Sequence, residues 1–376
     1  MKIKLYKLLR YIRIYGLTRA LIKVLGRTRP LINLMPFFSL FLFRRGSGSV
    51  GVVGAGQHAY SSIGFYLSRF TKVKILFVID PDPASSHSFS VAFNAENIPD
   101  SYDLGKCGTK TPDIVYIASN HASHSDYAIQ FMSYGSDVFI EKPIAITFDQ
   151  LNKLTSVARN FSGRIYSGYN RPFSPAVTKI RSEIKPVSPI SLSCAVIGHF
   201  IPSDHWYRDV KEGTRVLANM GHWIDLAVHL LFFRGSFPEY LEISYIFSDG
   251  SQPSDNVSIS LVSSQHDLIS IFFTSRSEPF EGVSESIVFQ QDSFIAKIND
   301  FRSMEVWREE NYEKIVYKPK DNGHRACVLQ PYKKVISRSW NELELSTRLI
   351  LTIEEMAINS ISKKRIYFNE TSTPIA

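Results

Sequence analysis

Short apolar runs alternate with stretches of helical periodicity in the part of the chain that follows residue 49. The runs are typical of buried strands, and the stretches near 60–70 and 123–134 favour helices. Strands that alternate with helices predict a mostly parallel sheet with both faces covered. These strands are expected at 50–53, 75–79, 113–118 and 137–140.

The pattern changes after residue 145. Helices are expected at 148–160, 173–185 and 339–360, with a short strand at 164–169. Runs rich in Ser, Val, Ile and Phe predict an antiparallel sheet, with strands at 190–199, 239–248, 255–263, 267–276 and 285–290. We therefore predict an α/β domain over 50–145 and an α+β domain over 146–376, which suits a chain of 376 residues.

Residues 1–49 form a separate basic extension. They contain eleven Lys and Arg and no acidic residue, which leaves 32 basic and 35 acidic residues in the rest of the chain. Leu, Ile and Tyr between the cations predict an amphipathic helix, and an apolar run at 31–43 is too short to span a bilayer. Two main interpretations stay open: an anchor on an anionic membrane surface through residues 1–45, or a helical arm that packs on its own second domain or on a partner subunit. A mitochondrial presequence stays open as a minor option.

The body of the chain is near-neutral, which argues against nucleic acid binding because phosphate recognition needs clustered cations. The three cysteines are scattered and no metal-ligand spacing occurs, so we expect no metal site and a reducing compartment. A signal peptide is not expected, because the basic region before the apolar run is too long. We expect a cytoplasmic protein, with the extension as its candidate attachment to the inner face of the membrane.

A glycine-rich turn follows the first predicted strand and precedes a predicted helix. Its residues are Gly54, Ala55, Gly56, Gln57, His58 and Ala59, and Asp80 ends the second strand. The glycines allow close approach to a pyrophosphate, the helix N-terminus attracts that anion, and the acid can hold a ribose diol. We predict a Rossmann domain, a doubly wound parallel sheet, that binds NAD. NADP is less expected because Asp80 would repel a 2′-phosphate, and a methyl-donor site is disfavoured.

Glu141, Lys142 and Pro143 follow the last predicted strand of this domain. Lysine at such an edge can polarise a carbonyl or support proton transfer. We also hypothesise that Pro143 is cis. Considered alone, the lysine fits a surface ion pair before a turn better, because most lysines are solvated.

A second candidate cluster opens an apolar helix. His222 and Asp225 lie three residues apart and share a helix face. A histidine held by an acid can serve as a general base at neutral pH. A histidine in an apolar helix can equally be structural.

Taken in order, the motifs resemble the glucose–fructose oxidoreductase and inositol dehydrogenase (Gfo/Idh/MocA) family. They are the Gly54–Ala59 turn, Ser119–His124, Glu141-Lys142-Pro143, Gly168–Pro175, His205–Asp209 and Gly221–Asp225. The resemblance implies that Lys142 and His222 are catalytic. It also implies that the second domain is built on an open, mainly antiparallel sheet whose face forms dimers or tetramers. It implies cofactor contacts from Ser119, Asn120, His121, His124, Glu141 and Lys142, and substrate contacts from Tyr169, Asn170, Arg171, Trp206 and Asp225.

One position departs from the family. Many members carry an Asp four residues before the catalytic histidine, where this chain has Ala218. The neighbouring Asn219 is therefore included as a catalytic candidate. We expect an NAD-dependent dehydrogenase of a sugar or nucleotide sugar in surface polysaccharide biosynthesis. The alternative is a regulatory or scaffold protein that binds cofactor or nucleotide sugar on the same fold without turnover.

Overall fold

The computed structural model describes residues 2–27, 48–98, 111–277, 282–332 and 338–368. Its contacts divide the chain into two units: residues 17–168 with 324–338, and residues 1–16 with 169–323 and 339–376. We call them the parallel-sheet unit and the large-sheet unit. The sequence placed a boundary at residue 145, whereas the parallel-sheet unit continues to Gly168 because the strand at Ile165–Ser167 adds to its sheet.

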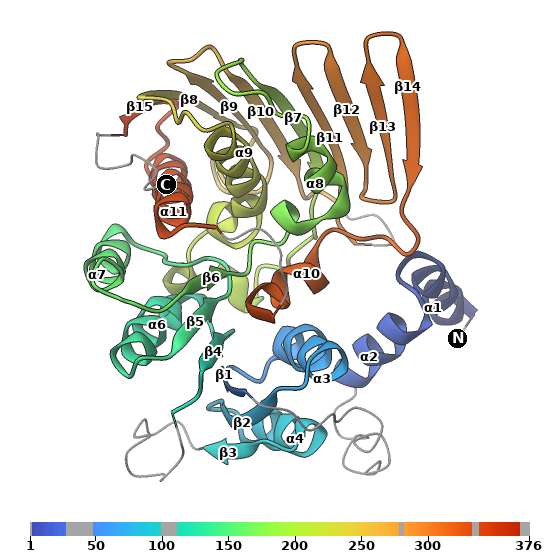
Figure 1. The fold of residues 1–376 in the computed structure, drawn as a ribbon, viewed down its shortest axis with the longest axis vertical. Helices are drawn as coiled ribbons and strands as arrows, with labels where there is room; N and C mark the ends of the chain where they lie inside the picture. The colour runs from blue at the N-terminus through green and yellow to red at the C-terminus, as the bar shows by residue number, and fades with distance from the viewer. Residues whose placement is uncertain (1, 28–47, 99–110, 278–281, 333–337, 369–376) are drawn as a thin grey trace. The chain divides into compact units, whose positions relative to one another are not determined.

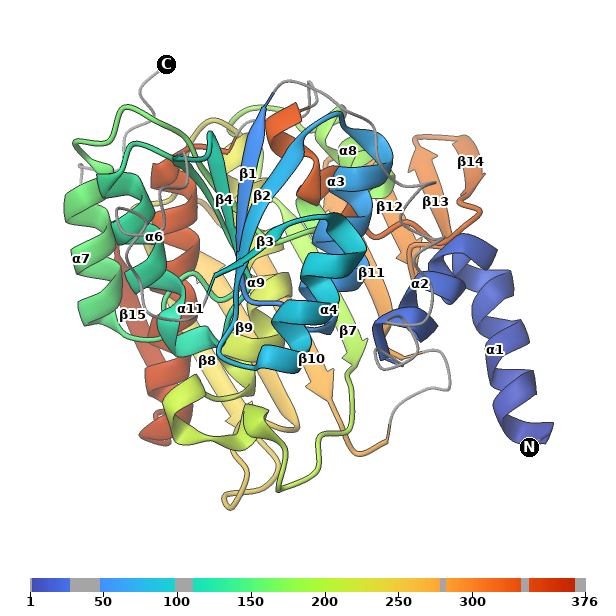
Figure 2. The ribbon, with the colours of Figure 1, turned by 90° about the horizontal axis from the view of Figure 1, so that it is seen from below.

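The parallel-sheet unit is the predicted doubly wound fold. All of its strand pairs are parallel, in the order β3-β2-β1-β4-β5-β6. Helices α3 and α4 lie on one side of this sheet and α6 and α7 on the other (Figure 2). The bounds are β1 Ser49–Val53, α3 Phe65–Phe70, β2 Lys74–Ile79, α4 Pro83–Phe93, β3 Glu96–Ile98, β4 Ile114–Ile117, α6 His124–Ser133, β5 Asp137–Ile140, α7 Phe148–Ala158 and β6 Ile165–Ser167.

Local signals explain where these helices begin. Asp82 accepts hydrogen bonds from the backbone N–H groups of Ala84 and Ser85 and precedes Pro83 at the first position of α4. Thr147 caps α7 in the same way. The central strands β1, β4 and β5 are buried almost throughout, as expected for a parallel sheet that is covered on both faces.

The large-sheet unit holds the predicted open sheet. Its order is β14-β13-β12-β11-β7-β10-β9-β8-β15, and every neighbouring pair is antiparallel except β7 with β10. Helices α8, α9 and α11 lie against one face (Figure 1). The bounds are α8 Pro175–Arg181, β7 Ser191–Ile197, α9 Gly221–Phe233, β8 Tyr240–Phe247, β9 Val257–Ser263, β10 Leu268–Thr274, β11 Ser284–Gln291, β12 Phe294–Asn299, β13 Ser303–Arg308, β14 Asn311–Val316, α11 Trp340–Ile358 and β15 Lys363–Tyr367.

Helices α9 and α11 pack together over this sheet and form its core. The apolar stretch Val210–Phe233, which includes α9, is long and apolar enough to cross a membrane, but 78% of its most apolar window is buried inside the fold. It is therefore explained as a core helix. Ser339 caps α11 by accepting from the N–H of Glu342.

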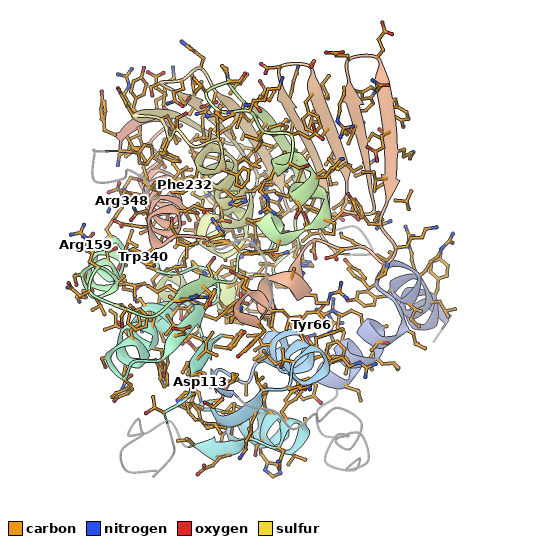
Figure 3. All side chains as sticks on the ribbon, in the orientation of Figure 1. Tyr66, Asp113, Arg159, Phe232, Trp340 and Arg348 are labelled. Atoms are coloured by element: carbon orange, nitrogen blue, oxygen red, sulfur yellow. The ribbon has the colours of Figure 1, made fainter. Side chains whose placement is uncertain are left out.

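The basic extension contributes one helix to each unit. Helix α1 (Lys2–Tyr15) belongs to the large-sheet unit, where Lys320 donates its backbone N–H to Ile14 O at 2.9 Å. Helix α2 (Leu17–Arg27) belongs to the parallel-sheet unit, where Arg19 donates to Ser61 O and lies 4.9 Å from the ring centre of Tyr66, labelled in Figure 3. The apolar run at 31–43 lies outside the described residues.

Candidate functional site

The glycine turn follows β1, and its first residue, Gly54, has a backbone conformation that only glycine adopts easily. Gly54 has φ +90°, and a Cβ there would lie 2.3 Å from Ala118 O. A Cβ at Gly56 would meet no atom within 4 Å, so the turn is open on that side. Gln57 and His58 are exposed, whereas Ala59 is buried beneath the helical turn Ala59–Gly64 that leads into α3. This is the geometry that the fingerprint requires.

Asp80 lies beside this turn, at the end of β2. Its Oδ2 accepts the N–H of Ala55 at 2.5 Å, and its Oδ1 accepts the N–H of Asp82 at 2.8 Å. The two bonds fix the carboxylate against the glycine turn, and each oxygen retains a lone pair for a ribose hydroxyl.

The loops after β4 and β5 lie at the same edge of the sheet, because these neighbouring strands are parallel. In the first loop, Ser119 Oγ lies 2.7 Å from Ser123 Oγ, which also donates to Asn120 Oδ1 at 2.7 Å. Asn120 is exposed, whereas His121 and His124 are only 3% and 1% exposed. The predicted cofactor residues of this loop are thus of two kinds: side chains at the surface, and buried side chains that support the loop.

In the second loop, the side chain of Glu141 is held in place by burial and by a contact with the glycine turn. It is buried, and its Oε1 lies 2.9 Å from Nε2 of His58 in the glycine turn. Burial alone would raise the pKa of Glu141, but His58, Lys142 and His124 outweigh it, so the pKa lies below its ordinary value. A Cβ at Gly168 would lie 2.4 Å from Glu141 Oε2, which explains the glycine there. The Lys142–Pro143 bond is cis, as hypothesised.

A distant segment completes the parallel-sheet unit. The helix α10 (His324–Val328) returns to this unit, and the ring centroid of His324 lies 6.2 Å from that of His58. Tyr116 Oη donates to Val328 O at 2.7 Å and anchors the segment to β4. Sequence reasoning missed His324, because nothing in its neighbourhood of the chain relates it to a glycine turn more than 260 residues earlier.

In the large-sheet unit, the predicted residues Tyr169 and His222 lie together. Their rings meet edge to face with centroids 5.9 Å apart. Gly221 permits this approach, since a Cβ there would lie 3.3 Å from Tyr169 Oη. Asp225, one turn along α9, is fully buried and accepts a hydrogen bond from Ser346 Oγ at 2.8 Å. Its burial favours an internal role over direct contact with substrate.

Asn170 and Arg171 belong to a buried polar cluster. Arg171 donates from Nε and Nη2 to Glu285 at 3.1 and 2.9 Å, and from Nη1 to Asn170 Oδ1 at 2.9 Å. Trp223 donates to Glu285 at 2.8 Å, and Asn170 donates to Asn322 O at 2.6 Å. A bidentate pair of this kind is a rigid support. No motif in the sequence pointed to Glu285, which lies on β11. The substrate contacts predicted for Asn170 and Arg171 stay predictions.

Asn219 is held by a buried arginine. Arg215 donates from Nε to Asn219 Oδ1 at 3.0 Å and from Nη2 to His199 O at 2.7 Å. Burial lowers the pKa of Arg215 to about 10, so it stays cationic at neutral pH. Trp206, by contrast, is 48% exposed on a short helical turn.

The structure therefore places the sequence-predicted residues in two sets. Gly54, His58, Asp80, Ser119 and Glu141, together with Lys142, belong to the parallel-sheet unit, and the Tyr169 and His222 set belongs to the large-sheet unit. The pairing of Lys142 with His222 stays a prediction. Among the described residues, no group of three or more His, Cys, Asp or Glu side chains could hold a metal ion.

The parallel-sheet unit, with its glycine turn and spaced acid, defines a class of protein: the NAD-binding Rossmann oxidoreductases. Residues 49–169 match the family model described as "Oxidoreductase family, NAD-binding Rossmann fold". The chain is thus similar, over this nucleotide-binding part, to the Gfo/Idh/MocA family. It is 26% identical over 180 residues to an inositol 2-dehydrogenase of Ralstonia nicotianae, which covers 46% of this chain and 49% of that protein. The chain thus matches about half the length of this curated relative.

Solved structures share the fold across both units. GenD2 from gentamicin A biosynthesis, in complex with NAD, gives a TM-score of 0.67 at 14% identity, covering 87% of this chain and 97% of that one. The UDP-N-acetylglucosamine 3-dehydrogenase GnnA of Acidithiobacillus ferrooxidans gives 0.65 at 14% identity, covering 84% and 98%. The fold class predicted from the sequence is confirmed.

Proposed function

We propose that the chain is an NAD-dependent oxidoreductase that acts on a ring carbon of a sugar or nucleotide sugar. The observation that carries the proposal is the Gly54 turn fixed beside Asp80, at the sheet edge that also bears Ser119 and Lys142. The residues fit a nicotinamide dinucleotide: Gly56 leaves room for a pyrophosphate, and the carboxylate of Asp80 suits a ribose diol and favours NAD over NADP.

The chain's own groups supply the proton chemistry in this proposal. When bound, the cofactor accepts or donates the hydride. His222 takes or returns the proton of the substrate hydroxyl, and the Lys142 ammonium stabilises negative charge that develops on that oxygen. Asn219, held by Arg215, contributes an amide near His222 in the chain, one residue after the position where many relatives carry Asp.

Surface polysaccharide biosynthesis is the setting that we propose. The similarity in fold to a nucleotide-sugar dehydrogenase supports a substrate of that class. The basic extension supports the proposal that the enzyme acts at a membrane that carries lipid-linked intermediates.

Turnover separates this function from its alternative, a scaffold that binds the same ligands. The purified chain is incubated with NAD⁺ or NADP⁺ and a panel of free sugars and nucleotide sugars, and reduced cofactor is followed at 340 nm. We expect turnover of at least one sugar with NAD⁺. Tight binding of NADH without turnover of any panel member, in either direction, would favour the scaffold.

The extension carries a surface suited to an anionic membrane. On α2, Leu17, Leu21 and Val24 share one face and are 57%, 48% and 42% exposed, while Ala20, Ile22 and Gly26 are buried. On α1, Tyr6 and Leu9 are exposed beside Arg10 and Arg13. Exposed apolar side chains among cations, with no acid in the segment, suit the headgroup region of anionic lipid. We therefore propose peripheral attachment at the cytoplasmic leaflet.

The second face of the large sheet supports a homo-oligomer. Its strands alternate buried and exposed residues, and the exposed set includes Ile246, Leu268, Phe272, Tyr312 and Val316, each at least 52% exposed. An apolar surface of this extent favours association with a second copy, as a dimer or tetramer.

A further inference from the structure

His124 lies between the two loops that form the rim of the proposed cofactor site. It begins α6, directly after the Ser119 loop, and is 1% exposed. Its Nδ1 lies 2.7 Å from Pro143 O, in the loop after β5, and its Nε2 lies 3.1 Å from Ser119 O, in the loop after β4. One imidazole thus contacts the backbone of both loops.

The protonation state of the His124 imidazole decides which of its two nitrogens donates a hydrogen bond to a carbonyl oxygen. Burial lowers the pKa of His124 below its ordinary value, and the carbonyls of Pro143 and Ser119 and the Glu141 carboxylate offset this only in part, while Lys142 adds to it. The ring of His121 also faces it, with centroids 6.0 Å apart. A neutral imidazole has one N–H. The shorter contact assigns that proton to Nδ1, which donates to Pro143 O.

We propose that His124 is a positioning residue that holds the Lys142 turn against the Ser119 loop. Its bond to Pro143 fixes the backbone one residue after Lys142. Glu141, one residue before Lys142, is held independently, by His58 through its side chain and by Ile117 O, which accepts its backbone N–H at 2.9 Å. The lysine is therefore flanked on both sides by anchored backbone, so little reorganisation is needed when a ligand binds.

This proposal rests on the proposed function, since the two loops matter because they would border the nicotinamide ribose. It differs from the sequence prediction, in which His124 itself lines the cofactor. A ring that is 1% exposed supports the site from behind and does not form its surface.

Three substitutions of His124 test the proposal. Phe keeps a ring but removes both nitrogens, Asn places an amide N–H near the position of Nδ1, and Gln places one near Nε2. His87→Asn, on α4 of the same unit, is the control. Amide hydrogen exchange is measured over residues 119–124 and 141–146 of the full, ligand-free chain, and the dissociation constants of NADH and NADPH are measured by fluorescence titration.

We expect His124→Phe to speed exchange in both segments by about tenfold and to weaken NADH binding by about tenfold. His124→Asn should restore slow exchange in 141–146 and most of the affinity, whereas His124→Gln should leave 141–146 fast. The control should match the wild type. This order of rescue follows from the Nδ1–H assignment and would not arise from packing alone.

The proposal is overturned if His124→Phe folds with exchange and affinity within twofold of the wild type, or if His124→Gln rescues 141–146 and His124→Asn does not. Should His124→Phe not fold, the comparison of Asn with Gln decides. Should the wild type bind neither dinucleotide, the proposed function fails, and exchange in the free chain still decides the role of His124.

Discussion

Each unit has a buried glutamate that organises the predicted polar residues of that unit. Glu141 joins the glycine turn to the Lys142 loop through His58, and Glu285 collects Arg171 and Trp223 in the large-sheet unit. Each is stabilised only while its partners are present, because a buried carboxylate without donors loses solvation that nothing replaces.

The lowered pKa of Glu141 predicts a specific acid sensitivity. A carboxyl group with a lower pKa in the folded than in the unfolded chain contributes stability above its ordinary value of 4.5, and this contribution is lost as the pH falls through the folded pKa. Glu141→Gln should therefore lower the free energy of unfolding at pH 7 by about 1–3 kcal/mol and reduce its decline below about pH 5. Urea unfolding between pH 7 and pH 4 measures both. An unchanged pH dependence would argue against the lowered pKa.

His222→Ala separates a catalytic from a structural histidine. As a general base, His222 should contribute roughly 10²- to 10⁴-fold to kcat and little to cofactor binding. We expect that loss in turnover with the NADH dissociation constant within twofold of wild type. His229→Gln is unsuitable as a control because His229 bonds Glu342 in the core, whereas the exposed His87→Gln on α4 is suitable. Parallel losses of turnover and affinity would indicate a structural role.

At the scale of single residues, the sequence predicts the role of a side chain where residues nearby in the chain determine that role. Gly54 and Asp80 were predictable because the fingerprint fixes both by spacing along the chain. Glu285 and His324 were not, since Glu285 lies 62 residues from Trp223 and 114 from Arg171, and His324 lies 266 residues from His58. The burial of His124 and Asp225 was also hidden, because a polar residue in a motif looks the same whether it faces a ligand or supports a loop.

At the scale of elements, the extension has two different surfaces. The inner side of α2 buries small residues against the parallel-sheet unit, where a Cβ at Gly26 would lie 3.4 Å from the Tyr60 ring. Its outer side exposes Leu17, Leu21 and Val24. A helix usually buries its large apolar side chains. The exposure of three such side chains on the outer side of α2 therefore indicates that this surface contacts something apolar.

Vesicle flotation tests that outer surface. The wild type should float with vesicles that contain anionic phosphatidylglycerol, bind several-fold less to neutral phosphatidylcholine, and be released by salt. Replacing Leu17, Leu21 and Val24 by Ser should reduce flotation at least tenfold, at about 0.8 kcal/mol for each buried CH₂ that is lost. Val91→Ser, which alters an exposed apolar residue on α4, should float as the wild type does. Equal recovery of all proteins in the soluble fraction would contradict membrane attachment.

Several elements escaped the sequence analysis for physical reasons. Helix α4 is rich in Ser and lacks an apolar stripe of clear period, so its Asp82 cap and Pro83 are its main local signals. Strands β12, β13 and β14 follow one another through short turns, and β14 is largely exposed, so hydrophobic alternation is weak there. The strands with strong alternation, such as β7, were predicted close to their observed bounds.

For the whole molecule, the open face of the large sheet predicts the oligomeric state. Native mass spectrometry of the purified chain should give a dimer or tetramer. Phe272→Glu places a charge in the middle of that face and should shift the mass to the monomer, because a buried unpaired charge is strongly unfavourable. Ile358→Glu, a similarly exposed site on α11, should leave the assembly intact. A wild-type monomer at micromolar concentration would contradict association through this face.

The central claim is that a nicotinamide dinucleotide binds at the Gly54 turn, and calorimetric titration of the purified chain tests it most directly. We predict one NADH per chain with NADPH at least tenfold weaker. Gly56→Val should abolish binding without unfolding, since its Cβ meets no neighbour in the free protein, and Gly250→Val should bind as the wild type does. No heat of binding for either dinucleotide, or equal affinity in Gly56→Val, would contradict the account.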